Sequence, residues 1–217
     1  MYAKYIKRFL DFTLSLMALL ALSPVLLVLM VLGAVKMKGN PFFTQPRPGK
    51  DEKIFNLIKF RSMTCEKDKE GNLLPDEQRL TRYGKLLRST SLDELPELIN
   101  ILKGDMSIVG PRPLLVKYLA FYNEQQHRRH DVRPGLTGLA QISGRNAIDW
   151  EDRLAIDVQY VNNISFLADC RIVLDTAFKV IKREGISQDN NATMEDFCDY
   201  MQQKNAAENA RVEGVKR

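Results

Sequence analysis

Two adjacent carboxylates, Asp93 and Glu94, stand out as residues that could carry out chemistry. A carboxylate can attack phosphorus and form an acyl phosphate, which divides one difficult transfer into two easier ones. A second carboxylate can help to hold Mg²⁺, which is usually bound by one or two carboxylates together with substrate phosphates. The cation would screen the attacking carboxylate from an anionic diphosphate. The pair therefore predicts phosphoryl transfer, with one carboxylate as the nucleophile and the other as a magnesium ligand.

A purely structural role competes for the same pair. Ser91 and Glu94 have the spacing of a capping box, and acidic residues in the first turn of a helix complement its dipole. Pro96 is expected in the first turn of this helix and Gly104 at its end. The helix N-terminus would also favour an incoming phosphate. Spacing alone favours capping, so the neighbouring residues must decide.

Arginines next to proline and glycine turns are the neighbours that favour chemistry. A guanidinium group is planar and matches phosphate oxygens, and a rigid turn can aim it at little entropic cost. The candidates are Arg88, which precedes the pair, and Arg112, Arg133 and Arg145. The sequence contains no Gly-x-Gly-x-x-Gly motif and no Walker loop, which are two other phosphate-binding devices.

The N-terminal segment Leu14–Val35 is nearly all apolar and is long enough to cross a bilayer. Basic residues flank it on both sides, so neither end is clearly the translocated one. Pro24 lacks an N–H and crowds the carbonyl of Leu20, and Ser23 can bond the freed backbone groups. A re-entrant helix broken at Ser23-Pro24 is favoured over a spanning helix that only bends. A signal peptide is disfavoured because no small-x-small cleavage site follows.

Composition narrows the class of protein. The 217 residues suit one domain with an appendage or two small domains, and the net charge of +5 suits an anionic partner such as lipid headgroups, nucleotide phosphates or nucleic acid. The three cysteines are far apart, which argues against a disulfide framework or structural zinc and favours a reducing cytosolic compartment. The two histidines, His127 and His130, lie in a basic stretch and are expected at the surface rather than as ligands or bases.

Periodicity predicts a strand and several helices along the rest of the chain. The strand covers Lys53–Phe60, and the helices cover Arg79–Arg88, Leu114–His130, Trp150–Tyr160 and Phe166–Arg183. The last helix carries apolar residues on one face, namely Phe166, Cys170, Val173, Ala177, Phe178 and Ile181. Packing of this face on the core is favoured over binding to a membrane surface.

The expected fold class is α+β and mainly helical, with short strands. Residues 1–38 are expected to form the membrane segment and residues 39–190 the catalytic domain. Residues 191–217 are expected to form a polar and partly disordered tail.

Several motifs together resemble the bacterial sugar transferase family, the monotopic phosphoglycosyl transferases, and among them the small PglC-type enzymes. The motifs are Ser23-Pro24, Lys59-Phe60-Arg61-Ser62-Met63, Leu92-Asp93-Glu94-Leu95-Pro96, Gly104-Asp105-Met106-Ser107-Ile108-Val109-Gly110-Pro111-Arg112-Pro113 and Arg133-Pro134-Gly135-Leu136-Thr137-Gly138. The resemblance covers about residues 1–190. It implies a re-entrant helix and interfacial amphipathic helices, with the globular part on the cytoplasmic face of the bacterial inner membrane.

The resemblance also implies a ping-pong reaction and the residues that perform it. Asp93 would attack the β-phosphate of a UDP-sugar, UMP would leave, and undecaprenyl phosphate would then accept the phospho-sugar. Glu94 would bind Mg²⁺. The implied phosphate contacts are Arg88, Arg112 and Arg145, followed by Lys59 and Arg133.

The donor and the assembly stay open at this point. PglC-type enzymes use an N,N′-diacetylbacillosamine donor, and the sequence does not distinguish it from N-acetylgalactosamine, glucose or galactose types. It also leaves open whether the chain forms a homodimer. A membrane-anchored binding protein is the main alternative to an enzyme. No nucleic acid partner is expected, because the sequence offers no aromatic and basic platform for one.

Overall fold

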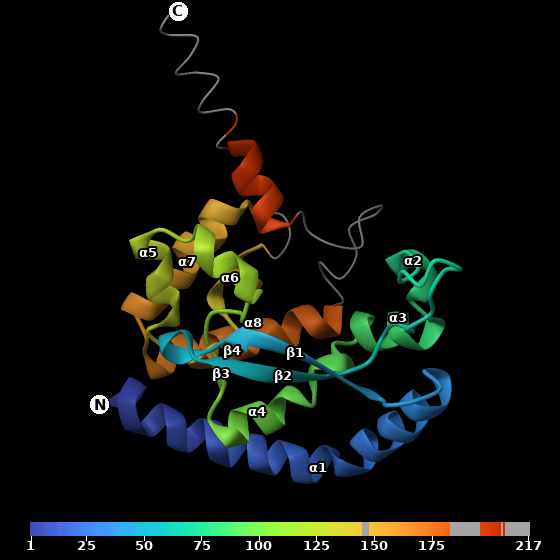
Figure 1. Ribbon diagram of the computed structural model, residues 1–217. Coiled ribbons are helices and arrows are strands. Elements are labelled where there is room, and N and C mark those ends of the chain that lie inside the picture. The colour runs from blue at the N-terminus through green and yellow to red at the C-terminus, as the bar shows by residue number, and fades with distance from the viewer. Residues whose placement is uncertain (145–147, 183–195, 205, 207–217) are drawn as a thin grey trace, which may run out of the picture.

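The computed structural model describes residues 1–144, 148–182, 196–204 and 206. A long N-terminal helix, α1 (Lys7–Lys36), lies beneath the rest of the molecule, with helix α4 (Glu97–Lys103) next to it (Figure 1). Two small two-stranded sheets and the remaining helices lie beyond α4. The predicted class, α+β and mainly helical, is confirmed. The predicted domain boundaries stay predictions.

Helix α1 follows a short π-helical turn, η1 (Tyr2–Ile6), and remains helical through Pro24. Ser23 Oγ donates a hydrogen bond to the carbonyl of Leu20, 2.8 Å away. Pro24 cannot donate to that turn and crowds it. The second half of α1 bends, so that its C-terminal end rises toward the start of strand β1 (Figure 1). The expected break at Ser23-Pro24 thus takes the form of a bend within a continuous helix.

The first sheet pairs β1 (Phe42–Pro48) with β2 (Ile54–Phe60) in antiparallel register, from Phe42 opposite Phe60 to Pro48 opposite Ile54. The predicted strand over Lys53–Phe60 is confirmed. Strand β1 was not expected, because its prolines indicate a turn when they are considered alone. A two-stranded sheet consists only of edge strands, where proline is tolerated.

The second sheet joins two motifs that are distant in sequence. Strand β3 (Ser107–Val109) runs parallel to β4 (Gly135–Thr137), with Ser107 opposite Gly135. A Cβ atom on Gly135 would lie 2.1 Å from the backbone nitrogen of Gly110. The two segments can therefore approach each other this closely only because both positions are glycine. This pairing places the loop that carries Arg112 beside the loop that follows Arg133.

The remaining helical segments agree with the prediction in part. Helices α7 (Trp150–Asn162) and α8 (Phe166–Lys182) confirm two predicted helices nearly residue for residue. The predicted helix over Arg79–Arg88 is instead two pieces, α2 (Asp76–Arg79) and α3 (Arg82–Ser89), because Thr81 caps a new helix by accepting a hydrogen bond from the Gly84 N–H at 3.0 Å. Helix α6 (Leu139–Ser143) is short.

The predicted single helix over Leu114–His130 is wrong. The segment forms η4 (Val116–Phe121), α5 (Glu124–His127) and η5 (Arg128–His130). Asn123 begins a new helix through a capping box with Gln126. The residues before Asn123 place Tyr118 and Tyr122 in a hydrophobic core that is rich in aromatic rings. Its buried members are Leu114, Tyr118, Tyr122, Trp150, Leu154 and Phe197. Phe197 belongs to residues 196–204, so this part of the C-terminal tail packs on the domain.

The two histidines occupy different environments. His127 is partly exposed, as expected, whereas His130 is only 5% exposed. The surface position predicted for His130 is therefore wrong, because η5 turns inward and packs this ring against Tyr122, with 5.7 Å between ring centroids.

Both halves of α1 contact the globular domain. Arg8 Nη1 donates to the carbonyl of Ile101 at 2.6 Å, near the start of α1. Near its end, the hydroxyl of Tyr83 donates to the carbonyl of Leu29 at 2.8 Å. Asp11 is buried and accepts a hydrogen bond from Ser107 Oγ at 2.8 Å. The helix therefore lies along the domain instead of leaving it at one end.

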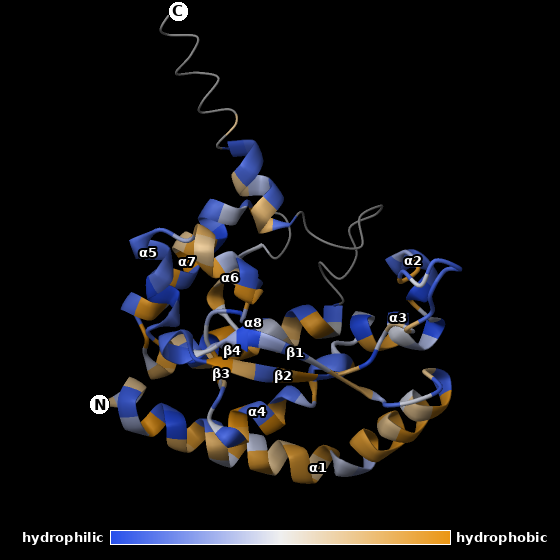
Figure 2. Cartoon of the chain, in the orientation of Figure 1, coloured by the Kyte–Doolittle hydropathy of each residue, from blue (hydrophilic) through white to orange (hydrophobic). Residues whose placement is uncertain are grey.

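Helix α8 exposes apolar residues that were expected to pack on the core. Phe166, Val173 and Phe178 are exposed, whereas Asp169 and Ile172 are buried. For these three residues the predicted packing on the core is wrong, because Asp169 fixes the other face against the N-terminal segment by accepting hydrogen bonds from Tyr2 and Lys7, at 2.7 and 2.6 Å. Cys170 is half-buried, and the side chain of Ile181 lies outside the described residues. Figure 2 shows α1 as the most continuously hydrophobic element of the molecule.

Candidate active site

Asp93 and Glu94 lie in a short 3₁₀ turn, η3 (Leu92–Glu94), between α3 and α4. The predicted capping box between Ser91 and Glu94 is absent. Ser91 has a left-handed backbone, with φ of 55°, and its side chain makes no capping hydrogen bond. Gly104 ends α4 in a left-handed conformation, as expected, whereas Pro96 immediately precedes the helix and is not part of its first turn. The two carboxylates are thus free of a capping role.

Glu94 is held by two cations from different parts of the chain. Its Oε1 lies 2.8 Å from Lys59 Nζ and 2.6 Å from Arg112 Nη2. Lys59 comes from β2, and Arg112 comes from the loop that follows β3. Burial opposes ionisation of this carboxyl, but the charges of Arg112 and Lys59 outweigh that effect and hold the pKa of Glu94 well below its usual range. Glu94 is therefore ionised at neutral pH.

Asp93 has no such partner. No described residue makes a hydrogen bond or an ion pair with its carboxylate. Burial raises its pKa, and the neighbouring charge of Glu94 raises it further. Lys59, Arg112 and Arg88 act in the opposite direction without touching it. An unpaired carboxylate surrounded by cations at longer range is suited to attack an anionic phosphate.

The predicted basic residues are only partly brought together. Lys59, Arg88 and Arg112 surround the carboxylate pair, and Arg88 Nε donates to Ser62 Oγ at 3.0 Å. Arg133 is placed elsewhere, because its Nε donates to the carbonyl of Gly104 at 2.8 Å and so completes the end of α4. Arg145 lies outside the described residues.

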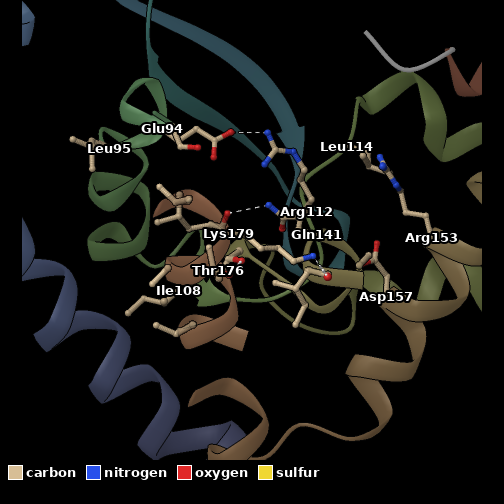
Figure 3. Close-up of a pocket in the computed structure, with 18 of the residues that line it drawn as sticks. Glu94, Leu95, Ile108, Arg112, Leu114, Gln141, Arg153, Asp157, Thr176 and Lys179 are labelled. Carbon is tan, nitrogen blue, oxygen red and sulfur yellow. Dashed lines mark hydrogen bonds and ion pairs between the residues drawn. The ribbon is translucent and has the colours of Figure 1, made fainter. Parts of the chain in front are cut away.

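A cavity of about 540 Å³ opens beside Glu94, which lines it together with Ser91 and Leu95, whereas Asp93 is not among the lining residues. Glu94 and Arg112 face each other on one side of it, and Arg153 and Asp157 lie on the other side (Figure 3). Arg88, Arg129 and Lys179 also line it. Arg129, Arg153 and Lys179 were not among the predicted residues, since a basic residue on a helix is usually solvated and nothing local marks these three. Their positive charge suits a ligand with several phosphate oxygens.

Behind Arg112 lies a buried ion pair that fixes its backbone. Arg129 Nη2 donates to the carbonyl of Arg112 at 2.7 Å and also lies 2.7 Å from Asp157 Oδ2. Both side chains are almost fully buried, so removal of either one would leave a buried charge without its partner. The pair therefore connects α7 and η5 to the loop that carries Arg112.

A second glutamate shares Lys59. Glu97 is 2% exposed, and its Oε1 lies 3.0 Å from Lys59 Nζ. Burial and the neighbouring charge of Glu94 raise the pKa of Glu97 to about 7. The folded protein therefore binds a proton at Glu97 across a pH range in which the unfolded chain has already released it.

This difference predicts a stabilising effect of Glu97→Gln that depends on pH. A glutamate in an unfolded chain titrates near pH 4.3. Between that pH and about 7 the folded protein holds more protons than the unfolded chain, so stability falls as pH rises, and the loss is complete above about 7. Glutamine has no such titration. The melting temperature of Glu97→Gln in detergent should therefore gain on that of the unmodified protein between pH 5 and pH 8.

The exposed residue Glu70 provides the matched control. Glu70→Gln should leave the pH dependence of the melting temperature unchanged. Parallel melting curves for Glu97→Gln and the unmodified protein across this range would contradict the assignment.

Glu94 is also the residue that fits a magnesium ligand. Lys59 and Arg112 both donate to its Oε1, and no described residue bonds to Oε2. An ionised carboxylate with one free oxygen, next to a second carboxylate, is the kind of oxygen donor that Mg²⁺ prefers. The residues therefore fit the cation, with the remaining ligands left to substrate phosphates.

Comparison with known proteins decides the family. The sequence model of the family described as "Bacterial sugar transferase" matches residues 2–183. The chain belongs to the bacterial sugar transferase family. The predicted family is thus confirmed, and the chain is an enzyme of the transferase class. The "Uncharacterized sugar transferase EpsL" of Bacillus subtilis (strain 168) is 52% identical over 192 residues, which cover 88% of this chain and 95% of the relative.

Two longer relatives carry more specific names. The undecaprenyl-phosphate galactose phosphotransferase of Salmonella typhimurium is 36% identical over 204 residues, covering 84% of this chain and 42% of the relative. The UDP-glucose:undecaprenyl-phosphate glucose-1-phosphate transferase of Klebsiella pneumoniae is 42% identical over 187 residues, covering 80% of this chain and 39% of the relative. This bacterial sugar transferase therefore spans less than half the length of these two relatives.

Proposed function

We propose that this enzyme transfers a sugar 1-phosphate from a UDP-sugar to undecaprenyl phosphate and releases UMP. The observation that carries the proposal is the unpaired carboxylate of Asp93, which feels the charges of Lys59, Arg88 and Arg112 and adjoins Glu94, a residue that lines a basic cavity. The names of the two longer relatives support this acceptor and this class of transferred group.

The reaction takes two steps. A carboxylate oxygen of Asp93 attacks the β-phosphorus of the UDP-sugar, and the bond from that phosphorus to the bridging oxygen breaks. UMP leaves with the bond's electron pair, and the phospho-sugar remains on Asp93 as an acyl phosphate. A phosphate oxygen of undecaprenyl phosphate then attacks the same phosphorus. Asp93 departs as a free carboxylate, and the product is undecaprenyl-diphospho-sugar.

The surrounding basic residues stabilise the negative charge of the diphosphate during this reaction. Arg112 and Arg88 contact the diphosphate oxygens, and the bond from Glu94 to Arg112 aims the guanidinium before the substrate arrives. Arg153 and Lys179 extend the positive lining toward the far side of the cavity. Mg²⁺ bound at Glu94 would neutralise charge on the diphosphate.

The shape of the molecule supports a monotopic position on the cytoplasmic face of the inner membrane. Helix α1 contacts the domain at both halves and buries only four of its residues, Asp11, Ser15, Leu29 and Gly33. Many of its apolar side chains are exposed, among them Phe9, Leu20, Leu27, Val28, Val31 and Val35, and α8 adds the exposed Phe166, Leu167, Leu174 and Phe178. A helix that enters one leaflet and returns would keep both of its ends with the domain. It would also keep Asp93 near the headgroup plane, where the phosphate of a lipid carrier lies.

This arrangement predicts that the N-terminus faces the cytoplasm. An epitope tag before Met1 should resist protease in intact spheroplasts and become digestible after lysis. Pro24→Ala should straighten α1 and expose a measurable fraction of the tags from outside, because it restores an N–H and removes the ring that forces the bend. The control Pro75→Ala lies just before α2, far along the chain from α1, and should not change accessibility. Digestion of the tag from outside in the unmodified protein would rule out the re-entrant form.

A UMP-release assay tests the function itself. The full chain in detergent would be given undecaprenyl phosphate, Mg²⁺ and one donor at a time from UDP-galactose, UDP-glucose, UDP-N-acetylgalactosamine and UDP-N,N′-diacetylbacillosamine. We expect one donor to release UMP at a rate well above the others, and chelation of Mg²⁺ to stop the release. The galactose and glucose donors named for the relatives come first in this panel. Failure of every donor to release UMP would overturn the proposal.

A further inference from the structure

A cluster of metal-ligating side chains lies outside the active site, where the β1–β2 turn meets α5 and η5. Glu52 belongs to the turn η2 (Lys50–Glu52), His127 ends α5, and His130 ends η5. One ligand atom of each of these three residues lies within 4.8 Å of the others. From this cluster we infer that Glu52, His127 and His130 bind a first-row divalent cation of the zinc type.

The donor set carries the inference. The two histidines are three residues apart on consecutive helical turns, which places both rings on one face. Glu52 Oε1 lies 2.5 Å from His127 Nδ1 and 3.4 Å from His130 Nδ1. Two imidazoles and one carboxylate form a set that zinc accepts with a fourth position left for water. Magnesium prefers oxygen ligands, so the cation proposed for Glu94 would not compete here.

His130 is the member that a purely structural account leaves unexplained. Its ring is buried, and neither of its nitrogens makes a hydrogen bond with a described residue, since Nδ1 has only the 3.4 Å contact with Glu52 and Nε2 has none. A buried polar group without a partner costs free energy, and a metal ion would supply the missing partner.

The backbone around Glu52 points in the same direction. Asp51 and Glu52 both have left-handed conformations, with φ of 53° and 59°, although neither is glycine. Such backbone strain persists where the surroundings impose it, and it often accompanies binding sites. Here it directs the Glu52 carboxylate toward the two rings. The ring of Tyr122 packs against both imidazoles, at 5.7 Å between centroids in each case, and limits their rotation.

The site needs only a small adjustment to accept the ion. Ligand atoms about 2.0–2.1 Å from a tetrahedral zinc lie about 3.4 Å from one another. The distance between Glu52 and His130 already has this value, and that between Glu52 and His127 must open by about 0.9 Å from 2.5 Å. Glu52 and His127 are both more than one-third exposed, so their side chains are free to make this movement. A bound cation would tie the β1–β2 turn to η5, next to the Arg129 that supports Arg112.

Metal titration of the full chain tests the site. The protein would be purified in detergent with a tag that contains no histidine, stripped with a chelator, and titrated with Zn²⁺ by calorimetry and by melting temperature. The chain has only two histidines, so any imidazole ligation reports on this cluster. We expect one equivalent to bind and to raise the melting temperature, because the ion binds only the folded protein. Mg²⁺ should give no such rise at the same concentration.

Variants distinguish the site from adventitious binding. Glu52→Gln and His127→Gln change partly exposed side chains, and each should weaken Zn²⁺ binding at least tenfold. The matched control Glu124→Gln removes the same charge from an exposed position on α5 and should bind as the unmodified protein does. With Co²⁺ as the probe, the spectrum should lack the intense thiolate charge-transfer bands that the free cysteines would produce. Unchanged affinity in both variants, a thiolate spectrum, or no binding at all would overturn the inference.

Discussion

Replacement of Asp93 by asparagine should reduce UMP release at least ~10³-fold, the order of loss that follows removal of a covalent nucleophile. The amide is close in size to the carboxylate, so the packing around η3 should be preserved. It carries no negative charge and is a much weaker nucleophile toward phosphorus. Because Asp93 makes no hydrogen bond or ion pair with a described residue, the substitution should not break a structural contact. Steady-state release of UMP by detergent-purified protein measures the effect.

The same variant should fail to trap the intermediate. Incubation with a UDP-sugar labelled in the sugar, without undecaprenyl phosphate, should leave label on the unmodified protein and none on Asp93→Asn. Asp131→Asn is the matched control, because it makes the same chemical change at an exposed position at the end of η5. Trapping of label on Asp93→Asn at the level of the unmodified protein would remove Asp93 from the nucleophile's role.

Local pattern was enough to predict the elements whose signal is local. Helix α7 and helix α8 have periodic apolar residues over several turns, and both were predicted nearly to their ends. The pattern did not determine whether the apolar face of α8 would contact the protein core or a lipid surface. An amphipathic helix looks the same whether its apolar side meets a core or a lipid surface. Only the tertiary contact of Asp169 with Tyr2 and Lys7 shows which face turns inward.

Strand β1 and the segment from Leu114 to His130 are regions where the local sequence pattern was not enough to predict the structure. Proline usually interrupts a strand unless the strand lies at the edge of a sheet. Whether a strand is at an edge depends on the whole sheet and not on the local sequence. The segment after Leu114 has the composition of a helix, but a new helix begins at Asn123. Burial of Tyr118 and Tyr122 in the hydrophobic core favours this interruption over one continuous helix. In both cases tertiary packing overrides local propensity.

The candidate site was predictable where its residues sit in specific motifs. Asp93, Glu94 and Arg112 were found in this way. Arg153 and Lys179 were not, because they reach the cavity from α7 and α8 and belong to no recognisable motif. Their shared lining of one cavity depends on long-range packing, which a single sequence does not reveal.

Arg112→Ala should lower kcat/KM for UMP release by about 10²–10³-fold, the range found when one preorganised donor to a developing charge is removed. Two effects act together. The guanidinium that we propose as a diphosphate contact is lost, and Glu94 loses the partner that lies 2.6 Å away. Since the charge of Arg112 is the largest influence that lowers the pKa of Glu94, that pKa should rise in the variant and the magnesium ligand should become easier to protonate.

Arg112→Lys separates charge from geometry. Lysine keeps the positive charge but lacks the planar fork that bonds a carboxylate and a phosphate at the same time. It should therefore recover only part of the loss, and its activity should remain at least ~10-fold below that of the unmodified enzyme, since an oriented guanidinium bonded to Glu94 becomes a mobile point charge. Arg128→Ala is the matched control, because Arg128 is exposed, bonds Asn162 and does not line the cavity. If Arg112→Ala retained activity within threefold of the unmodified enzyme, Arg112 would be a structural partner of Glu94 and not a substrate contact.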